Sequence, residues 1–162
     1  MYIFILQFTR SKNPPEDHFN SVLSFGYSLL FKEMYGIIES KGLNPYFGFI
    51  HSDKEGHPAL VSDMIEEWRA IIVDSMILDM INSHEITLDD FQEIEGVKSF
   101  YLNDAGRKKL IAKYNSKMNT KVSYICDHPN ISYRRAMDDQ VKSLIHVIDE
   151  KDGCKYSPIF LR

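Results

Sequence analysis

The chain has 162 residues, of which 44% are hydrophobic, 12% aromatic and 26% charged. This is ordinary globular composition, and it excludes a disordered tail, a collagen-like fibre and a low-complexity linker. The length suits one domain, which can bury about 70% of the surface that its unfolded chain would expose. The two cysteines, Cys126 and Cys154, form neither a CxxC pair nor a zinc-ligand spacing, which argues against a disulfide scaffold and a zinc ribbon.

The formal net charge of −4 argues, taken alone, against nucleic acid as a partner, but the charge is unevenly distributed. Residues 1–50 are neutral, residues 51–100 carry three basic and twelve acidic residues (net −9), and residues 101–162 carry twelve basic and seven acidic ones (net +5). An acidic block before a basic block has two interpretations. The carboxylates form a solvated face, or they hold a metal ion near a phosphate backbone.

The first half of the chain predicts a strand and two long helices. Residues 1–12 read as one strand, and the prolines and acids of residues 14–17 are typical of a helix start. Apolar residues at helical spacing predict a helix over about 15–40, ended near Gly42 and Pro45, in which Gly26 is expected to make a close helix contact. A loop over 43–57 follows, and Pro58 begins a second helix that runs to about Asn82.

The second half predicts a short helix near 88–92 with Thr87 as its N-cap, a strand over 97–102, a basic helix over about 104–118, and a last helix over about 132–150 ended by Gly153. The expected fold is therefore mainly α, a helical bundle-like single domain over 1–162 with a short N-terminal strand and a small strand near 97–102. Charged residues interrupt the apolar stretch 64–81, so no membrane-spanning segment is predicted and the expected location is cytoplasmic.

A histidine and a row of carboxylates form the candidate site. His51 closes an apolar segment, and Asp63, Glu66 and Glu67 follow at helical spacings that are expected to place them on one side of the second helix. Carboxylates this close repel each other, so a cation or an arginine should lie among them. Mg²⁺ and Mn²⁺ both prefer carboxylate oxygens, and Mn²⁺ also accepts imidazole nitrogen. Equally, acids in a first helical turn need no metal, and a lone histidine is usually just hydrogen-bonded.

The basic helix has the same two interpretations. Arg107 and Lys108, with the lysines that follow, form either a solvated face or a phosphate-binding surface, and Tyr133-Arg134-Arg135 suits either a phosphate backbone or local pairing.

Four motifs in order resemble one family, the spacer-acquisition integrase of CRISPR systems, the first-numbered CRISPR-associated protein. The residues that carry the resemblance are 10–17 with 20–30, then 42–51, 60–69, and 132–136 with Gln140. The likeness covers nearly the whole chain.

The resemblance implies a divalent-metal-dependent DNA endonuclease of antiviral defence, whose active sites join 3′-hydroxyl ends of a prespacer to a CRISPR repeat by transesterification. It implies Mg²⁺ or Mn²⁺ as cofactor, with His51, Glu66 and Asp63 as catalytic and metal-binding residues, of which Asp63 is the adjacent acid in a supporting role. The partners implied are DNA, a second copy of the enzyme, and a small ferredoxin-like CRISPR-associated subunit. The residues then expected to contact DNA are Arg69, Arg107, Lys108, Arg134 and Arg135.

The chain also departs from the family pattern at specific positions. The family's first catalytic glutamate lies on a helix upstream of the opening motif, so the chain is expected to be the C-terminal helical domain alone, without the N-terminal β domain. Trp68 replaces the usual phenylalanine, and His57 stands where arginine is common. Two other functions remain open: a non-catalytic DNA-binding or assembly module, left by a truncated gene, and a plain helical interaction protein.

Overall fold

The computed structural model describes residues 17–51, 56–94, 97–123, 130–153, 156 and 158. In chain order its elements are α1 (His18–Ser40), α2 (Ala59–Trp68), the π-helical segment η1 (Arg69–Asp74), α3 (Ser75–Asn82), the short 3₁₀ helix η2 (Leu88–Asp90), β1 (Phe91–Ile94), β2 (Val97–Leu102), α4 (Asp104–Asn119), β3 (Lys121–Val122), β4 (Ile131–Ser132) and α5 (Tyr133–Glu150). The expected mainly α fold is confirmed. The strand expected over 1–12 lies outside the described residues.

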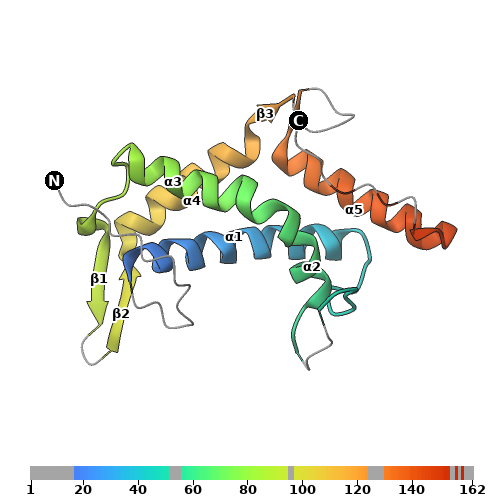
Figure 1. Cartoon of the computed structure of the whole chain (residues 1–162), viewed down its shortest axis with the longest axis horizontal. Coiled ribbons are helices and arrows are strands. Elements are labelled where there is room, and N and C mark those ends of the chain that lie inside the picture. The colour runs from blue at the N-terminus through green and yellow to red at the C-terminus, as the bar shows by residue number, and fades with distance from the viewer. Residues whose placement is uncertain are drawn as a thin grey trace.

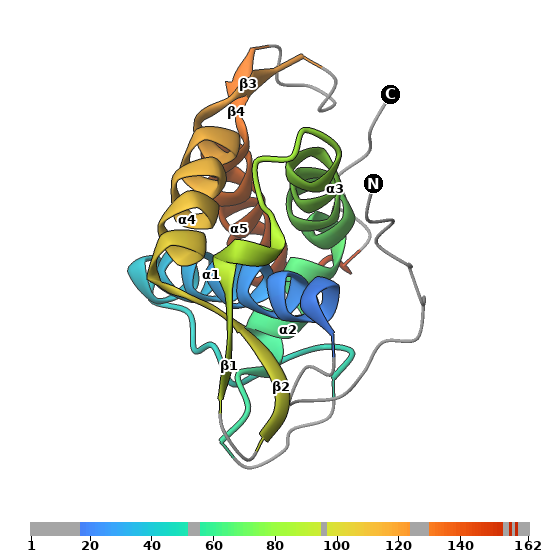
Figure 2. The same cartoon turned by 90° about the vertical axis from the view of Figure 1, so that its left-hand side faces the viewer.

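Helix α1 is the central element of the domain. It contacts α2, η1, α3, α4, α5 and β2, and the other helices lie around it (Figure 1). The hairpin β1–β2 and the pair β3–β4 lie at opposite ends of the helical assembly (Figure 2). Side chains from every helix meet in one core, where Trp68 of α2 and Tyr133 of α5 are buried edge-to-face with ring centroids 6.5 Å apart.

The start and end of α1 follow from local chemistry. Asp17 caps the helix by accepting a hydrogen bond from the backbone N–H of Asn20 at 2.8 Å. Gly42 adopts a φ of +78° just past the end, a conformation that glycine takes without steric cost. A Cβ on Gly26 would lie 2.8 Å from Cγ1 of Val73, so the expectation of a close helix contact there is confirmed.

The second long helix is continuous from Ala59 to Asn82, as expected, but its middle turn is π-helical. The extra residue of a π-helical turn shifts the register of every side chain after it. Arg69 and Asp74 are the first and last residues of this turn, and both reach Tyr27 on α1. Hydrophobic periodicity does not indicate such a shift, so the π-helical turn could not be predicted from the apolar pattern.

One boundary and one helix-ending residue differ from expectation. The helix expected near 88–92 stops at Asp90, and Phe91 begins strand β1, which pairs antiparallel with β2 in the register Phe91 to Leu102. Pairing with a strand six residues further on decides the conformation of this segment, and a local pattern does not encode that partner. The last helix ends at Glu150, as expected, but Lys151 rather than Gly153 takes the left-handed conformation that ends it, with a φ of 54°. No helix within the described residues is both long and apolar enough to cross a bilayer.

Candidate active site

Asp63 organises the loop that precedes α2. Its Oδ2 accepts hydrogen bonds from the backbone N–H groups of Phe49 (2.5 Å) and Ile50 (3.0 Å), and its Oδ1 accepts one from the backbone N–H of His51 (3.0 Å). The carboxylate side chain is only 4% exposed. Burial acts to raise the pKa of Asp63, but these hydrogen bonds and that of the His51 ring outweigh it and lower the pKa below 3.8.

His51 is held in one orientation by the same carboxylate. Its Nδ1 lies 2.5 Å from Oδ1 of Asp63, while the side chain remains 42% exposed. With the proton on Nδ1, Nε2 keeps its lone pair, and this nitrogen has no hydrogen-bond partner among the residues that the structure describes. A carboxylate that fixes a histidine tautomer in this way is typical of metal-binding histidines.

A cleft of about 530 Å³ brings His51 and Glu66 together. Its lining comes from α1, the loop before α2, α2 itself and the first residue of η1, and includes Tyr27, Lys32 and Arg69. Glu66 is half exposed and accepts a hydrogen bond at 2.6 Å from Nη1 of Arg69. The expectation that an arginine lies among the acidic side chains is therefore confirmed for Glu66.

Arg69 is itself supported by α1. Its guanidinium lies 4.5 Å from the ring centroid of Tyr27, and the Tyr27 hydroxyl donates to Oδ1 of Asp74 at 2.5 Å. Burial and then the hydrogen bond to Asp74 raise the pKa of Tyr27. Sequence reasoning missed Tyr27 as a lining residue, because its position on α1 has no regular relation to the acidic motif.

The expectation that Asp63, Glu66 and Glu67 share one side of the helix is wrong. Asp63 and Glu67 border a second, apolar pocket of about 310 Å³, whereas Glu66 faces the cleft. Consecutive helical residues point about 100° apart, and this rotation places Glu66 at the cleft and Glu67 at the apolar pocket. Glu67 instead accepts a hydrogen bond at 2.8 Å from the hydroxyl of Tyr156, a residue that no sequence signal singled out.

The residues that line the cleft supply some, but not all, of the ligands that a divalent ion needs. His51 presents a nitrogen and Glu66 a carboxylate to one cleft, which are donors that Mn²⁺ accepts. Asp63 uses both oxygens to accept four N–H groups, which favours a supporting role over direct ligation. Across the described parts of the chain, no three His, Cys, Asp or Glu side chains form a group that could hold a metal ion.

The four arginines expected to contact DNA all form ion pairs. Arg69 pairs with Glu66, Arg107 with Asp104, Arg134 with Glu33 and Arg135 with Asp139. Lys108 is exposed and forms no ion pair with the residues described. DNA contact by these five side chains stays a prediction.

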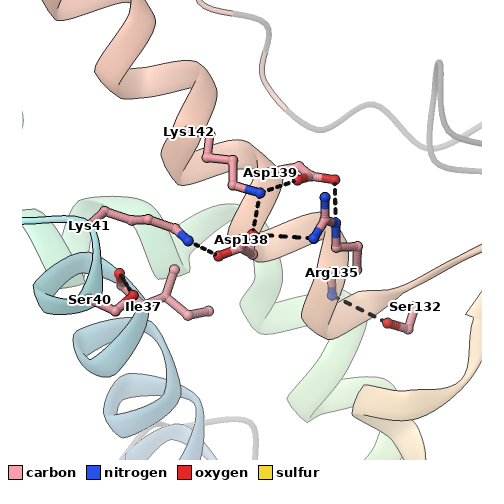
Figure 3. A network of polar contacts seen from close by, with 8 residues as sticks. All are labelled: Ile37, Ser40, Lys41, Ser132, Arg135, Asp138, Asp139 and Lys142. Atoms are coloured by element: carbon pink, nitrogen blue, oxygen red, sulfur yellow. Dashed lines mark hydrogen bonds and ion pairs between the residues drawn. The ribbon is translucent and has the colours of Figure 1, made fainter.

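Arg135 belongs to a network that joins α5 to the end of α1. Asp138 accepts from Lys41 and Lys142 at 2.6 Å each, and Asp139 pairs with Arg135 and Lys142 (Figure 3). Hydrogen bonds from Lys142 and Lys41 lower the pKa of Asp138. The network therefore cross-links two helices by charge rather than leaving Arg135 free.

We expect Asp138→Asn to lower the free energy of unfolding by less than about 1 kcal/mol, because partly exposed ion pairs contribute little. The loss should shrink further in about 1 M NaCl, where the Debye length is about 3 Å. Urea titration followed by the fluorescence of Trp68, the only tryptophan, measures it. Asp149→Asn on the same helix is the control, and a loss that salt leaves unchanged would contradict the electrostatic origin.

Comparison with known families defines the class of protein. The family model described as "CRISPR associated protein Cas1" matches residues 6–116. The chain is 35% identical over 141 residues to the CRISPR-associated endonuclease Cas1 of Mycobacterium tuberculosis strain H37Rv, covering 86% of this chain and 42% of that protein. It is 32% identical over 154 residues to a Cas1 endonuclease of Thermus thermophilus, covering 94% of this chain and 45% of that protein. This chain belongs to the Cas1 family of CRISPR-associated proteins, and it spans less than half the length of these relatives.

Solved structures agree with this assignment. A casposase bound to integration product superposes with a TM-score of 0.79 at 29% identity, covering 90% of this chain and 41% of that one. The Cas1 protein of Thermotoga maritima superposes with a TM-score of 0.79 at 25% identity, covering 87% of this chain and 42% of that one. A Cas6-RT-Cas1--Cas2 complex at 24% identity shows the fold alone.

Proposed function

We propose that this chain forms the catalytic helical domain of a divalent-metal-dependent DNA endonuclease and integrase, which joins the 3′-hydroxyl of a prespacer to a CRISPR repeat. The observation that carries the proposal is a cleft lined by both His51, whose ring Asp63 orients through Nδ1, and the half-exposed carboxylate of Glu66. Family membership and the similarity to a casposase bound to integration product support the same reaction class.

In this reaction the oxygen of the 3′-hydroxyl forms a bond to phosphorus, and the bond from phosphorus to the repeat's bridging oxygen breaks, with a proton passing to the leaving oxygen. Such a transfer depends on positioning and charge neutralisation more than on a covalent protein nucleophile. When bound, Mg²⁺ or Mn²⁺ would supply that charge neutralisation and activate the attacking hydroxyl.

The chain's own residues would prepare the site. Asp63 holds the ring of His51, which lines the cleft, through Nδ1, and Arg69, stacked on Tyr27, holds the carboxylate of Glu66. Lys32 and His57 line the same cleft, where their positive or hydrogen-bonding groups suit a phosphodiester. We propose that water, substrate phosphate and groups outside the described residues supply the remaining ligands, because two protein donors fill only part of the coordination shell of these ions.

Partners follow from the same proposal. We propose that the working enzyme is a homodimer in which Cas1 pairs with a small ferredoxin-like CRISPR-associated subunit. DNA would be the substrate, as a prespacer and a CRISPR repeat. The alternative, a purely electrostatic DNA-binding module, has little support from α4. Lys109 of this helix is already paired with Asp90, and Lys113 with Asp79 and Glu85.

Isothermal titration with Mn²⁺ tests the site. We expect His51→Ala to bind Mn²⁺ at least about 10-fold more weakly than the unchanged chain, because even residues that only orient a ligand contribute 10- to 100-fold. His146→Ala, on the exposed side of α5, is the matched control and should leave binding unchanged. Equal affinities for the chain and for His51→Ala would contradict a role for His51 in metal binding.

A further inference from the structure

A chain of hydrogen bonds connects the helix that carries Glu66 to the end of the domain. The buried indole Nε1–H of Trp68 donates to Oε1 of Gln140 on α5 at 2.6 Å. Nε2 of Gln140 donates to the hydroxyl oxygen of Tyr156 at 3.0 Å, and this hydroxyl donates to Oε1 of Glu67 at 2.8 Å. Three segments that lie far apart in the sequence are thereby joined at the last turn of α2.

The chemistry of the four groups allows only one donor-to-acceptor direction along this series of hydrogen bonds. An indole N–H can only donate, so the Gln140 oxygen must face Trp68 and the Gln140 amide nitrogen must face Tyr156. The Tyr156 oxygen then accepts from the amide, and its proton is directed to Glu67, whose carboxylate ends the series. Trp68 is fully buried and Gln140 is 4% exposed, so water does not offer either of them an equivalent partner.

Anchoring two consecutive helical residues determines how α2 is rotated about its axis. Trp68 and Glu67 point about 100° apart, so fixing both leaves α2 one orientation. Asp63 lies one turn before Glu67, on the side facing the loop that it holds, while Glu66 is directed into the cleft. The π-helical turn begins directly after Trp68, so the anchor lies at the last residue before the helical register shifts.

We propose that Tyr156 is a positioning residue of the Cas1 active site: by binding Glu67 it fixes the rotation of α2, which places Glu66 in the cleft and Asp63 beneath His51. This inference rests on the proposed function for its consequence for metal binding, but not for its geometry. Glu67 then has a structural role and Glu66 a metal-binding role, although the two acids are adjacent in the sequence. The competing assignment is that Glu67 is itself a metal ligand.

Tyr156→Phe removes only the hydroxyl and is the main variant. We expect amide hydrogen exchange at Phe49, Ile50 and His51, whose N–H groups bind Asp63, to accelerate by about 10-fold, and Mn²⁺ to bind about 10-fold more weakly. Tyr101→Phe on β2 is the matched control and should change neither quantity. Exchange at 49–51 that stays at the original rate in Tyr156→Phe, or acceleration spread evenly over all helices, would overturn the positioning role.

Variants of Glu67 separate the two assignments. Glu67→Gln keeps an oxygen that accepts from Tyr156, so it should retain Mn²⁺ affinity within about 3-fold, whereas Glu67→Leu should resemble Tyr156→Phe. Combining Glu67→Leu with Tyr156→Phe should add little to either change alone, because both remove the same contact. Loss of Mn²⁺ binding in Glu67→Gln with full retention in Tyr156→Phe would overturn the proposal in favour of Glu67 as a ligand.

Hydrogen exchange also separates this proposal from the proposed function. If the unchanged chain and the control both fail to bind Mn²⁺, the metal site is contradicted, while exchange at residues 49–51, which needs no metal, still decides whether Tyr156 positions α2.

Discussion

Asp63→Ala is expected to lower the free energy of unfolding by about 2–4 kcal/mol and to abolish Mn²⁺ binding at His51. Hydrogen bonds to a charged acceptor are worth about 1.5–3 kcal/mol each, and Asp63 accepts four, although water will recover part of the loss at an exposed loop. Without the carboxylate, the loop loses its attachment to α2 and the His51 ring loses its orientation. Urea titration monitored by Trp68 fluorescence measures the first effect and calorimetry the second.

Two variants control this experiment. Asp74→Ala removes another partly buried carboxylate of the same long helix. Among the described residues it accepts one side-chain hydrogen bond, from Tyr27, so its loss should cost clearly less stability. Asp63→Asn keeps one acceptor oxygen but places an amide N–H group where another donor already points. Its stability should therefore lie between that of the unchanged chain and that of Asp63→Ala. A cost for Asp63→Ala no greater than that for Asp74→Ala would show that Asp63 does not hold the loop.

The pH dependence of stability has a sign that follows from the lowered pKa of Asp63. A carboxyl group whose pKa is lower in the folded chain than in the unfolded one binds its proton less tightly when folded. Its stabilisation is therefore fully present well above pH 3.8 and disappears as the pH falls through the lower, folded-state pKa. Asp63→Ala should remove this part of the acid sensitivity, so the two stability curves should converge at low pH.

Gly48→Ala is expected to cost about 1–3 kcal/mol of stability and to weaken Mn²⁺ binding by about 10-fold. A Cβ at this position would lie 2.7 Å from both the Ala59 Cβ and Oδ2 of Asp63, and 2.9 Å from the carbonyl carbon of Ala59. The first residue of α2 is fully buried and cannot move aside, so the loop must move instead. That movement separates the Phe49 and Ile50 N–H groups from Asp63 and displaces His51.

Gly36→Ala is the matched control for this substitution. Gly36 is exposed on α1, and a Cβ there meets no atom within 4 Å. Alanine in an exposed helix should stabilise the chain by about 0.5–1 kcal/mol, because glycine costs more conformational entropy. Hydrogen exchange at residues 49–51 should accelerate in Gly48→Ala only. If Gly48→Ala is as stable as Gly36→Ala, the loop does not pack against α2 as closely as the structure describes.

Local signals predicted the helices well because each signal acts within the helix it marks. Asp17, Asn103 and Ser132 cap their helices through hydrogen bonds to backbone groups three residues away. Strand β1 was missed because its conformation depends on pairing with β2, and the π-helical turn because it depends on how Arg69 and Asp74 meet Tyr27 of α1.

The residues proposed for the candidate site came from the sequence, but their arrangement did not. Motif resemblance selected His51, Asp63 and Glu66, and the structure places His51 and Glu66 on one cleft. It also separates Glu66 from Glu67, which spacing alone had grouped together. Tyr156 could not have been found, because its contact with Glu67 spans 89 positions in the sequence.

The sequence by itself determined the helices, their caps and the uneven charge: net −9 over residues 51–100 and +5 over residues 101–162. Only the tertiary structure decided what those charges do. Asp79 and Glu85 pair with Lys113, and Asp90 pairs with Lys109, across the fold. Asp63 is buried and holds His51, whereas Glu66 is the one acid of the motif that lines the cleft. The reason is physical: helix formation depends on neighbours a few residues away, whereas the partner of a charge depends on which distant segment packs against it.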